Sequence, residues 1–476
     1  MPLLESSLHS DLACGDICGE QAPAWAGALP EEVQLRSAAA EAISPFAMDR
    51  KVLGGLLFLG IFLFFWISLN PFVDLTLQAS ASIATDNSNK LNQILFLCLP
   101  LASVAMAMAT PMRGKLLQPL ALTVPIFLWF LLASLVSNHT LNSLKALILS
   151  YLVVLGANCC LLLPRSQVHF AKLIAIGTGA VLLLCYYGLY FLPHFSIHSA
   201  AEVMEPMHAG LWRGYFPHKN NAASAMVLLA FCGIFVMRAW SKWTGLVLLA
   251  GSVWFLLHTG GKTASAMLPA ILLLAFIFER FAWLRTAIAF GGVLLVNVVA
   301  VGAAVSPGLT SFITSLGVDA TFTNRADIWR LAMNAVSEFP LTGYGLKSFW
   351  RTEELVYGGT GIETWAVQAA HSHNGYVEIL LSVGFPGLIL SLLWFLAVPL
   401  RAFNRLEKAG PPSHAARLFL RIWLYLLFAS TLESLFFESA SGYNLAWFMF
   451  ALALFGLRYE ADAQQVRERP REACAS

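Results

Sequence analysis

Long apolar runs separated by short polar connections fill most of the chain. A bilayer core requires roughly 20 consecutive apolar residues for each helical span, and about twelve runs approach or reach that length. They lie near 52–70, 92–110, 117–136, 144–163, 170–192, 222–237, 243–258, 263–279, 284–305, 375–400, 416–432 and 442–457. The pattern therefore predicts an all-α integral membrane protein, a polytopic bundle of about 12 transmembrane helices.

The same pattern predicts how the chain is divided. Residues 1–48 are polar and lack the basic stretch and short apolar run of a cleavable signal peptide, so we expect a disordered cytoplasmic tail. Transmembrane helices 1–9 are expected within 49–305, a large loop within 306–374 and helices 10–12 within 375–457. A short cytoplasmic tail, 458–476, would follow them.

Composition supports the same class of protein. The 476 residues are 58% hydrophobic and only 12% charged, a balance that soluble domains with a solvated surface rarely have. The net charge of +2 arises from basic residues in short clusters between apolar runs, not from one basic surface. We therefore exclude nucleic acid as a partner and expect the lipid bilayer as the environment.

The positions of Lys and Arg predict the orientation in the membrane. One side of the bundle collects most cations: Arg50, Lys51, Arg113, Lys115, Arg165, Lys172, Arg238, Lys242, Arg280, Arg285, Arg401, Arg405, Lys408, Arg417 and Arg421. The positive-inside rule makes that side cytoplasmic. Both termini are then cytoplasmic, and the 306–374 loop before the tenth span lies on the outer side.

A few cations break this rule on the outer side: Arg213, Lys219, Lys262, Arg325, Arg330, Lys347 and Arg351. Long outer loops translocate regardless of charge, which accounts for some of them. It accounts poorly for Lys262, because HTGGKTASAM places this residue in a very short hairpin between two spans. The alternative is that these cations form a site for an anion such as a phosphate or diphosphate.

The stretch TNRADIWRLAMNAVSEFPLTGYG predicts an amphipathic helix inside the long loop. Thr323 or Asn324 would cap its N-terminus, and Pro340 would end it. The expected apolar side comprises Ile328, Trp329, Leu331, Ala332, Ala335 and Val336.

Two arginines of this predicted helix differ in what they suggest. Arg325 lies at the helix N-terminus, where the helix dipole disfavours a cation, so it is a candidate ligand for an anion. The alternative is an ion pair with Asp327 or with a loop carboxylate such as Glu353. Arg330 follows Asp327 by three residues, which predicts an ordinary helical ion pair.

Polar residues crowd the start of the tenth apolar run in AAHSHNGYVEILLSVGFPG. If the helix begins near His373, its dipole keeps that imidazole neutral and able to accept a proton. Asn374 could orient the ring, and Glu378 is an ionisable group at membrane depth, which marks a functional candidate. The alternative is a structural histidine that caps the helix, and His371 lies further out on the loop.

At these residues the sequence resembles the O-antigen ligase family of bacterial polytopic membrane proteins. HNGYVEILLSVGFPG has a His-Asn pair, nine residues, a Gly, two residues and a Gly, which is similar to the family's signature stretch. GYFPHKNNAASAM and RADIWRLAMNAVSEFPLTGYG resemble two further family stretches, so the likeness covers roughly 205–390. One departure is Lys262, where relatives often have a Ser-Arg pair. Lysine keeps the positive charge but lacks the planar guanidinium that can bind an anion through two N–H groups.

The resemblance implies a GT-C-like membrane glycosyltransferase. It would transfer O-antigen polysaccharide from undecaprenyl diphosphate to the lipid A-core oligosaccharide on the periplasmic face of the bacterial inner membrane, completing lipopolysaccharide. The expected partners are therefore the carrier-linked glycan donor, the lipid A-core acceptor and the bilayer. No cofactor is expected.

The residues fit this chemistry. A diphosphate leaving group needs charge neutralisation more than a general acid, whereas the attacking sugar hydroxyl needs a base. We predict His373 as the base and Arg213 and Arg325 as ligands of the diphosphate. Lys219 and Lys262 would be supporting cations, and Asn220 and Asn374 would orient their neighbours. Glu378 would position His373, and His371 would be a further substrate-binding residue. The outer acids Asp319, Asp327, Glu353, Glu354 and Glu363 are scattered, so we predict a metal-independent, inverting transferase.

Other functions stay open on the sequence alone. An O-antigen polymerase or a protein O-oligosaccharyltransferase would use the same carrier donor and differ only in its acceptor. A secondary transporter would place polar residues near the bilayer midplane in two matched halves. Here the ionisable residues gather on one face and no repeat is visible, so transport is the weaker alternative.

Overall fold

The computed structural model describes residues 50–67, 69–76, 90–109, 114, 120–202, 206–317, 325–358, 365–438 and 444–473. Over these ranges the secondary structure is helical, apart from one isolated bridge between Ile197 and Trp212. The α-helices are α2 (Arg50–Trp66), α3 (Lys90–Met108), α5 (Leu120–Leu135), α6 (Thr140–Leu162), α7 (Gln167–Phe191), α8 (Pro193–Ser196), α9 (Lys219–Ala239), α10 (Lys242–His258), α11 (Lys262–Arg280), α12 (Val293–Val305), α13 (Pro307–Ser315), α14 (Arg325–Glu338), α15 (Glu353–Tyr357), α16 (Gly375–Leu392), α17 (Val398–Lys408), α18 (His414–Ala429) and α19 (Asn444–Ala473). Shorter segments are the 3-10 helices η1 (Pro206–His208), η2 (Ala282–Leu284) and η4 (Trp365–Gln368) and the π-helices η3 (Ala287–Gly292) and η5 (Leu393–Ala397).

Each of the predicted apolar runs coincides with a helix, so the all-α membrane class is confirmed. Seven helical segments of the described chain are long and apolar enough to cross a bilayer: Lys90–Met108, Thr140–Leu162, Gln167–Phe191, Lys219–Ala239, Lys262–Arg280, Ala282–Val305 and Gly375–Lys408. Three shorter apolar helices are Val52–Trp66, Thr123–Leu135 and Lys242–His258. The number of twelve spans and the GT-C-like arrangement therefore stay predictions.

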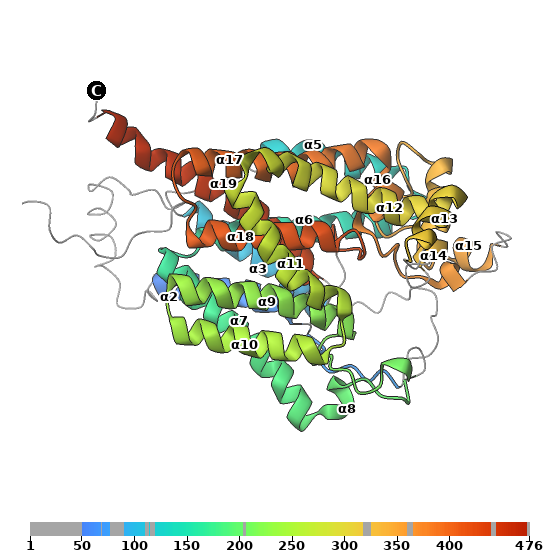
Figure 1. Cartoon of the computed structure of the whole chain (residues 1–476), viewed down its shortest axis with the longest axis horizontal. Helices are drawn as coiled ribbons and strands as arrows, with labels where there is room; N and C mark the ends of the chain where they lie inside the picture. Colours follow the sequence, from blue (N-terminus) through green and yellow to red (C-terminus); the bar gives the residue numbers. More distant parts are fainter. Residues whose placement is uncertain are drawn as a thin grey trace, which may run out of the picture.

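The predicted tails differ in what can be said of them. The N-terminal tail, 1–48, lies outside the described residues. The C-terminal tail was expected from residue 458, and α19 continues through this segment as one helix to Ala473. Its apolar beginning is buried among other helices, and its polar end projects from the bundle (Figure 1).

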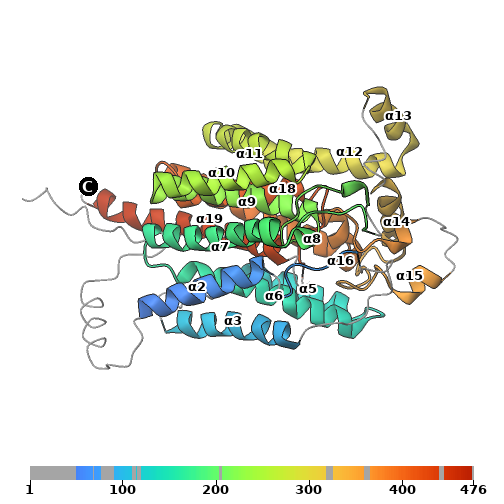
Figure 2. The same ribbon diagram turned by 90° about the horizontal axis from the view of Figure 1, so that it is seen from below.

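The long helices run side by side, and the short helices α13, α14 and α15 gather at one end of the bundle. Figures 1 and 2 show α13, α14 and α15 at this end, whereas the C-terminal part of α19 projects from the opposite end. The two ends of the bundle are therefore chemically different, and the end with α14 receives the 371–374 loop that precedes α16.

The interior of the bundle is built from helices whose side chains are mostly buried. These helices are α9, α18 and the first half of α19. α9 and α10 approach closely because Gly233 lies against the backbone of Leu249 and Gly245 against the backbone of Met237. By contrast, only 22% of the apolar window of α3 or of α11 is buried, so these helices face lipid.

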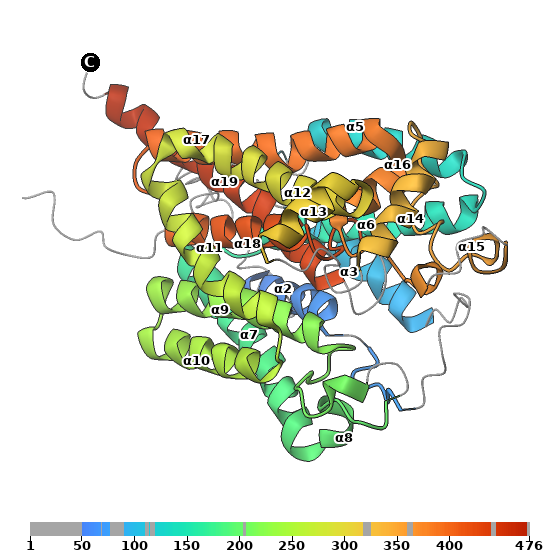
Figure 3. The same ribbon diagram turned by 45° about the vertical axis from the view of Figure 1, so that its right-hand side comes forward.

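α14 confirms the predicted amphipathic helix. It runs from Arg325 to Glu338, and its buried residues are Ile328, Trp329, Leu331, Ala332, Ala335 and Val336. The predicted caps Thr323 and Asn324 lie outside the described residues. α14 packs against α12 and α16, across the mouth of the bundle (Figure 3).

α16 is broken at Gly384, and the loop after α14 fills the break. Gly384 has φ 68° and ψ −174°, a conformation open almost only to glycine. Three backbone hydrogen bonds join loop and helix: Tyr344 N to Leu381 O at 2.9 Å, Gly345 N to Ser382 O at 2.8 Å and Phe385 N to Pro340 O at 2.9 Å. Backbone groups released at membrane depth need such partners inside the protein. Two of the family-like stretches therefore form one structural unit.

Candidate active site

The site is built on the N-terminus of α16, which begins at Gly375 and is capped by Asn374. The side-chain oxygen Oδ1 of Asn374 accepts from the backbone N–H groups of Tyr376 at 2.9 Å and Val377 at 3.1 Å. Its amide nitrogen donates to Asn297 on α12 and to the carbonyl of Thr431 after α18. This buried side chain therefore joins three parts of the bundle at the place where the site lies, and its hydrogen bonds within the described residues go to groups other than the His373 ring.

The short loop before α16 is held from two sides at Ser372. The Ser372 carbonyl accepts from the Trp329 indole on α14 at 2.9 Å, and its N–H donates to the Glu378 carboxylate at 2.8 Å. Glu378 also accepts from the Trp350 indole at 3.1 Å and is buried. Glu378 thus fixes the backbone next to His373, and its role in positioning His373 stays a prediction.

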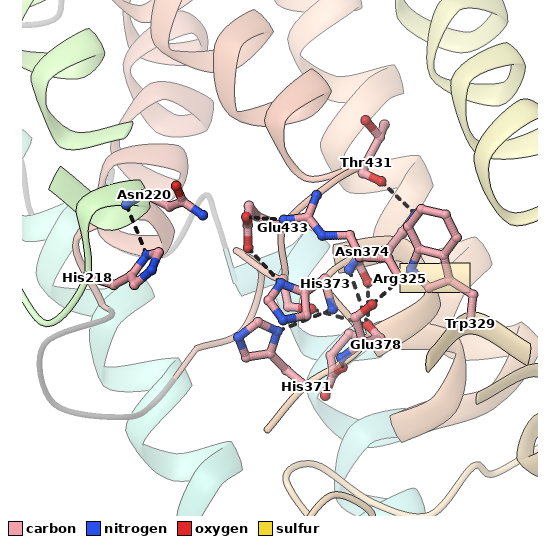
Figure 4. Close-up of polar contacts among 12 residues, drawn as sticks. His218, Asn220, Arg325, Trp329, His371, His373, Asn374, Glu378, Thr431 and Glu433 are labelled. Carbon is pink, nitrogen blue, oxygen red and sulfur yellow. Dashed lines mark hydrogen bonds and ion pairs between the residues drawn. The ribbon is translucent and has the colours of Figure 1, made fainter. Parts of the chain in front are cut away.

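His373 belongs to a chain of charged and polar contacts. Its Nδ1 lies 3.2 Å from one carboxylate oxygen of Glu433, and the other oxygen of Glu433 accepts from Arg325 at 2.7 Å. Among the described residues, Nε2 of His373 has no hydrogen-bond partner, and the side chain is 33% exposed. Figure 4 shows Glu433 between Arg325 and His373, with His371 beside them. A carboxylate at Nδ1 fixes the neutral tautomer whose Nε2 carries the lone pair.

The two neighbours of His373 have strongly shifted pKa values. Burial opposes ionisation of Glu433, but the hydrogen bond with His373 and the charge of Arg325 prevail and lower its pKa to about 2. Burial lowers the pKa of His371 to about 3, and the positive charges of Lys347 and Arg325 act in the same direction. At neutral pH Glu433 is therefore an anion and His371 a neutral ring, 4.1 Å from the ring of His373.

The backbone at His373 is strained. Its φ is 52°, in the left-handed region that a residue with a Cβ atom seldom adopts. Such a conformation costs on the order of 1–3 kcal/mol and is kept only where the surroundings impose it. The hydrogen bonds of Ser372 and the cap by Asn374 flank this residue on either side and supply that constraint.

α9 brings two further predicted residues to the same end of the bundle. Asn220 is exposed, and Figure 4 shows its side chain directed towards Glu433. Lys219 is buried, and its backbone N–H donates to His198 Nε2 at 3.2 Å. Asn220 therefore faces the site, while Lys219 is part of the packing at the start of α9.

Lys262 lies at the start of α11 and is exposed. The preceding Gly261 packs so closely on α9 that a Cβ atom there would lie 2.6 Å from the Cβ of Ala223. Because Ala223 is one turn from Asn220, the cation of Lys262 is held at the same end of the bundle as Asn220. The sequence predicted a tight hairpin here, and α10 indeed ends at His258.

Arg213 is placed differently from the other predicted ligands. Its side chain is fully buried, and its guanidinium donates to the carbonyl of Phe216 at 3.0 Å and that of Val73 at 2.7 Å. These bonds fasten two loops together. The geometry favours a structural role, and its assignment to the diphosphate stays a prediction.

The structure shows which acid each arginine of α14 pairs with, a question that the sequence left open. Arg330 pairs with Asp327 at 2.8 Å, as predicted. Arg325 does form an ion pair, but its partner is Glu433 and not Asp327 or Glu353. Only one terminal nitrogen of Arg325 is used in this pair, so the rest of the guanidinium can still bind an anion.

Glu433 is the site residue that the sequence reasoning missed. It follows the predicted span 416–432 and lies 60 residues from His373 along the chain. The sequence did contain a signal for Glu433, since it is an acid at the end of an apolar run. Glu378 was singled out because it is likewise an ionisable group at membrane depth. Across the described residues, no group of three or more His, Cys, Asp or Glu side chains is arranged to hold a metal ion.

Fold and site together define a multi-pass helical membrane protein with a cluster of ionisable side chains at one end of its bundle. Residues 245–392 match the family model described as O-Antigen ligase. The family predicted from the sequence motifs is thereby confirmed. The match supports a ligase or polymerase function on lipid-linked glycans; it includes Lys262, Arg325 and His373 but not Glu433. No curated protein matches the chain.

Proposed function

We propose that the protein is an O-antigen ligase. It transfers the polysaccharide from undecaprenyl diphosphate to the lipid A-core oligosaccharide on the periplasmic face of the inner membrane. The observation that carries this proposal is the contact between Glu433 and Nδ1 of His373, which leaves Nε2 as a proton acceptor at the mouth of the bundle. The family match supports the class of donor.

In the proposed reaction His373 is the base. An acceptor hydroxyl attacks the anomeric carbon of the donor sugar, and its proton passes to Nε2 of His373. A new carbon–oxygen bond forms while the bond from the anomeric carbon to the diphosphate oxygen breaks. The diphosphate leaves with the bonding electrons, and attack from the opposite face inverts the anomeric centre. Glu433 stabilises the imidazolium that results.

The cations near the site suit the leaving group. Arg325 keeps unused N–H donors beside the Glu433 pair, and Lys262 lies exposed at the start of α11. Together with Asn220 they offer a polar rim for a diphosphate, whose growing charge they would neutralise. This arrangement supports metal-independent transfer, because Arg and Lys would take the place of a divalent cation.

The test is glycan transfer by purified protein in detergent, with undecaprenyl diphosphate-linked O-antigen and lipid A-core as substrates, in the presence of EDTA. We expect product from the natural protein and a rate lower by about 10²–10⁴-fold for His373→Ala, the usual contribution of a general base. Size-exclusion profiles and melting temperatures show whether the variant is folded.

The other outcomes are informative. If the natural protein lengthens the carrier-linked glycan and ignores lipid A-core, the acceptor is a growing chain and the protein is a polymerase. If transfer stops in EDTA and returns with a divalent cation, the metal-independent mechanism is wrong. If folded His373→Ala keeps its full rate, His373 is structural.

A further inference from the structure

A cavity of about 280 Å³ lies between α9, α11 and α18, away from the candidate active site. α9 begins at Lys219 beside that site, and Arg238, which lines the cavity, lies near the other end of the helix. With a rise of about 1.5 Å per residue the two ends are about 30 Å apart. α18 shows the same separation, since it begins at His414 in the cavity wall and ends shortly before Glu433. The cavity is therefore a separate feature of the molecule.

The lining combines cations with apolar side chains. Arg238, Arg417, Arg421 and His414 form its polar wall, and Leu272 and Phe276 belong to its apolar wall. The lining also contains one acid, Glu279, which binds Arg417 at 2.9 Å. Three arginines and one glutamate leave two positive charges at the cavity.

Two of the arginines lack a partner within the described part of the chain. Neither Arg238 nor Arg421 makes a hydrogen bond or ion pair there, although Arg421 is half-buried on α18. The pKa of the nearby His414 ring is lowered by burial and by the same excess of positive charge. The positive charges are those of Arg417, Arg238 and Arg421. The cavity is therefore a place of positive potential that an anion would neutralise.

Aromatic side chains put this end of the bundle at the depth of lipid headgroups. Trp240 ends α9, Trp243 lies in the first turn of α10 and Trp283 lies in η2, and they are 44%, 71% and 77% exposed. Exposed indoles of this kind gather at the boundary between membrane and water. Phe276 on α11 is 63% exposed while it also lines the cavity, so the cavity has an apolar side that is open to the surroundings.

We propose that this cavity binds the phosphate group of an anionic membrane lipid. Arg238 and Arg421 are its ligands, Arg417 is held next to them by Glu279, and the acyl chains lie against Phe276 and Leu272. Guanidinium groups match the geometry of phosphate oxygens, and basic pockets between membrane helices suit anionic headgroups. Free inorganic phosphate shares the chemistry of the headgroup but has no apolar part that would pack against the exposed apolar side of the cavity. A lipid has both parts and is therefore the better fit.

The experiment uses the full chain, purified in detergent. Its thermal unfolding midpoint is measured while phosphatidylglycerol, phosphatidylcholine or inorganic phosphate is added, and native mass spectrometry counts the lipid molecules retained. Four proteins are compared: the natural chain, Arg238→Gln, the double variant Arg238→Gln/Arg421→Gln, and the control Arg401→Gln. Arg401 is an exposed cation of α17 at the same end of the bundle and does not line the cavity.

We expect phosphatidylglycerol to raise the midpoint of the natural chain and of Arg401→Gln, with phosphatidylcholine having little effect. The phosphatidylglycerol concentration for the half-maximal shift rises on the order of tenfold in the double variant, and by a smaller factor in Arg238→Gln, whose exposed side chain is not needed for folding. Equal shifts by both lipids, or equal responses of Arg238→Gln and Arg401→Gln, overturn the site. If inorganic phosphate alone reproduces the shift, the phosphate chemistry stands and the lipid source is wrong.

Discussion

At the scale of residues, Glu433 decides how His373 works in the proposed reaction. An imidazole can take a proton at either nitrogen, and the carboxylate at Nδ1 leaves Nε2 as the acceptor. Glu433 itself touches no substrate in this mechanism. It acts through His373 and is a positioning residue, kept ionised by Arg325 and by the hydrogen bond with His373.

We predict that Glu433→Gln lowers kcat for glycan transfer by roughly 10–100-fold, the effect of losing a hydrogen bond to a charged group, and leaves KM for the donor little changed. Initial rates at several donor concentrations separate the two parameters. Glu433→Asp keeps the charge and should recover part of kcat. Asp327→Asn is the matched control, because it removes a carboxylate from an exposed ion pair on α14. A Glu433→Gln enzyme with unchanged kcat would contradict the positioning role.

The same residues show what the sequence could and could not predict about the site. His373 and Arg325 were singled out as ionisable groups at expected helix N-termini, and Lys262 as a cation in a very short hairpin. The structure brings the three to one end of the bundle, and their roles stay predictions. Glu433 was missed because its contact with His373 joins two elements 60 residues apart. Spacing within one helix carries no information on such a contact. Arg213 was singled out for its charge, but burial among loop carbonyls is not visible in the sequence.

At the scale of elements, the break in α16 and the loop that fills it set the position of the helix end that bears the candidate site. The backbone of the Pro340–Gly345 segment replaces helical hydrogen bonds that Gly384 interrupts. Gly343 has φ 63°, and a Cβ atom there would lie 2.5 Å from the carbonyl oxygen of Leu381. Glycine is therefore required on both sides of this junction.

We predict that Gly384→Ala destabilises the protein strongly. The backbone conformation alone costs a non-glycine residue on the order of 1–3 kcal/mol, and the added Cβ would collide with the carbonyl oxygen of Leu341. The control is Gly291→Ala in η3, where a Cβ meets nothing within 4 Å. Yield of monodisperse protein and melting temperature in detergent compare the two variants. Equal stability of both would mean that the junction can rearrange.

Elements with a regular period were the predictable ones. The apolar side of α14 follows from its spacing in the sequence, and each apolar run gave a helix. The break in α16 was not predicted, because glycine and proline within an apolar run are also tolerated in unbroken membrane helices. The deciding partner is a loop some forty residues earlier, about the distance from Pro340 to Gly384.

At the scale of the whole molecule, the bundle has two polar ends with different chemistry. One end combines acids and bases around His373, and the other has an excess of arginine around the cavity. The positive-inside rule predicts that the first end faces the periplasm and the second the cytoplasm.

We predict that the two ends react with thiol reagents from opposite sides of the inner membrane. In a background without native cysteines, Lys262→Cys should be labelled in intact cells by a maleimide that passes the outer membrane and not the inner one. Lys408→Cys, at the exposed end of α17, should be labelled only after the inner membrane is permeabilised. The reverse pattern would invert the proposed orientation and place the transfer site in the cytoplasm.

The left-handed backbone of His373 has a consequence for how this position evolves. Glycine, and to a lesser degree asparagine, would relax the φ of 52° that histidine adopts here. Under selection for folded protein alone, drift should replace the histidine. Under selection for a complete polysaccharide coat, histidine should be kept in spite of its strain. In a library of variants, the fate of position 373 would then distinguish lineages that need the glycan from lineages that have lost the use for it.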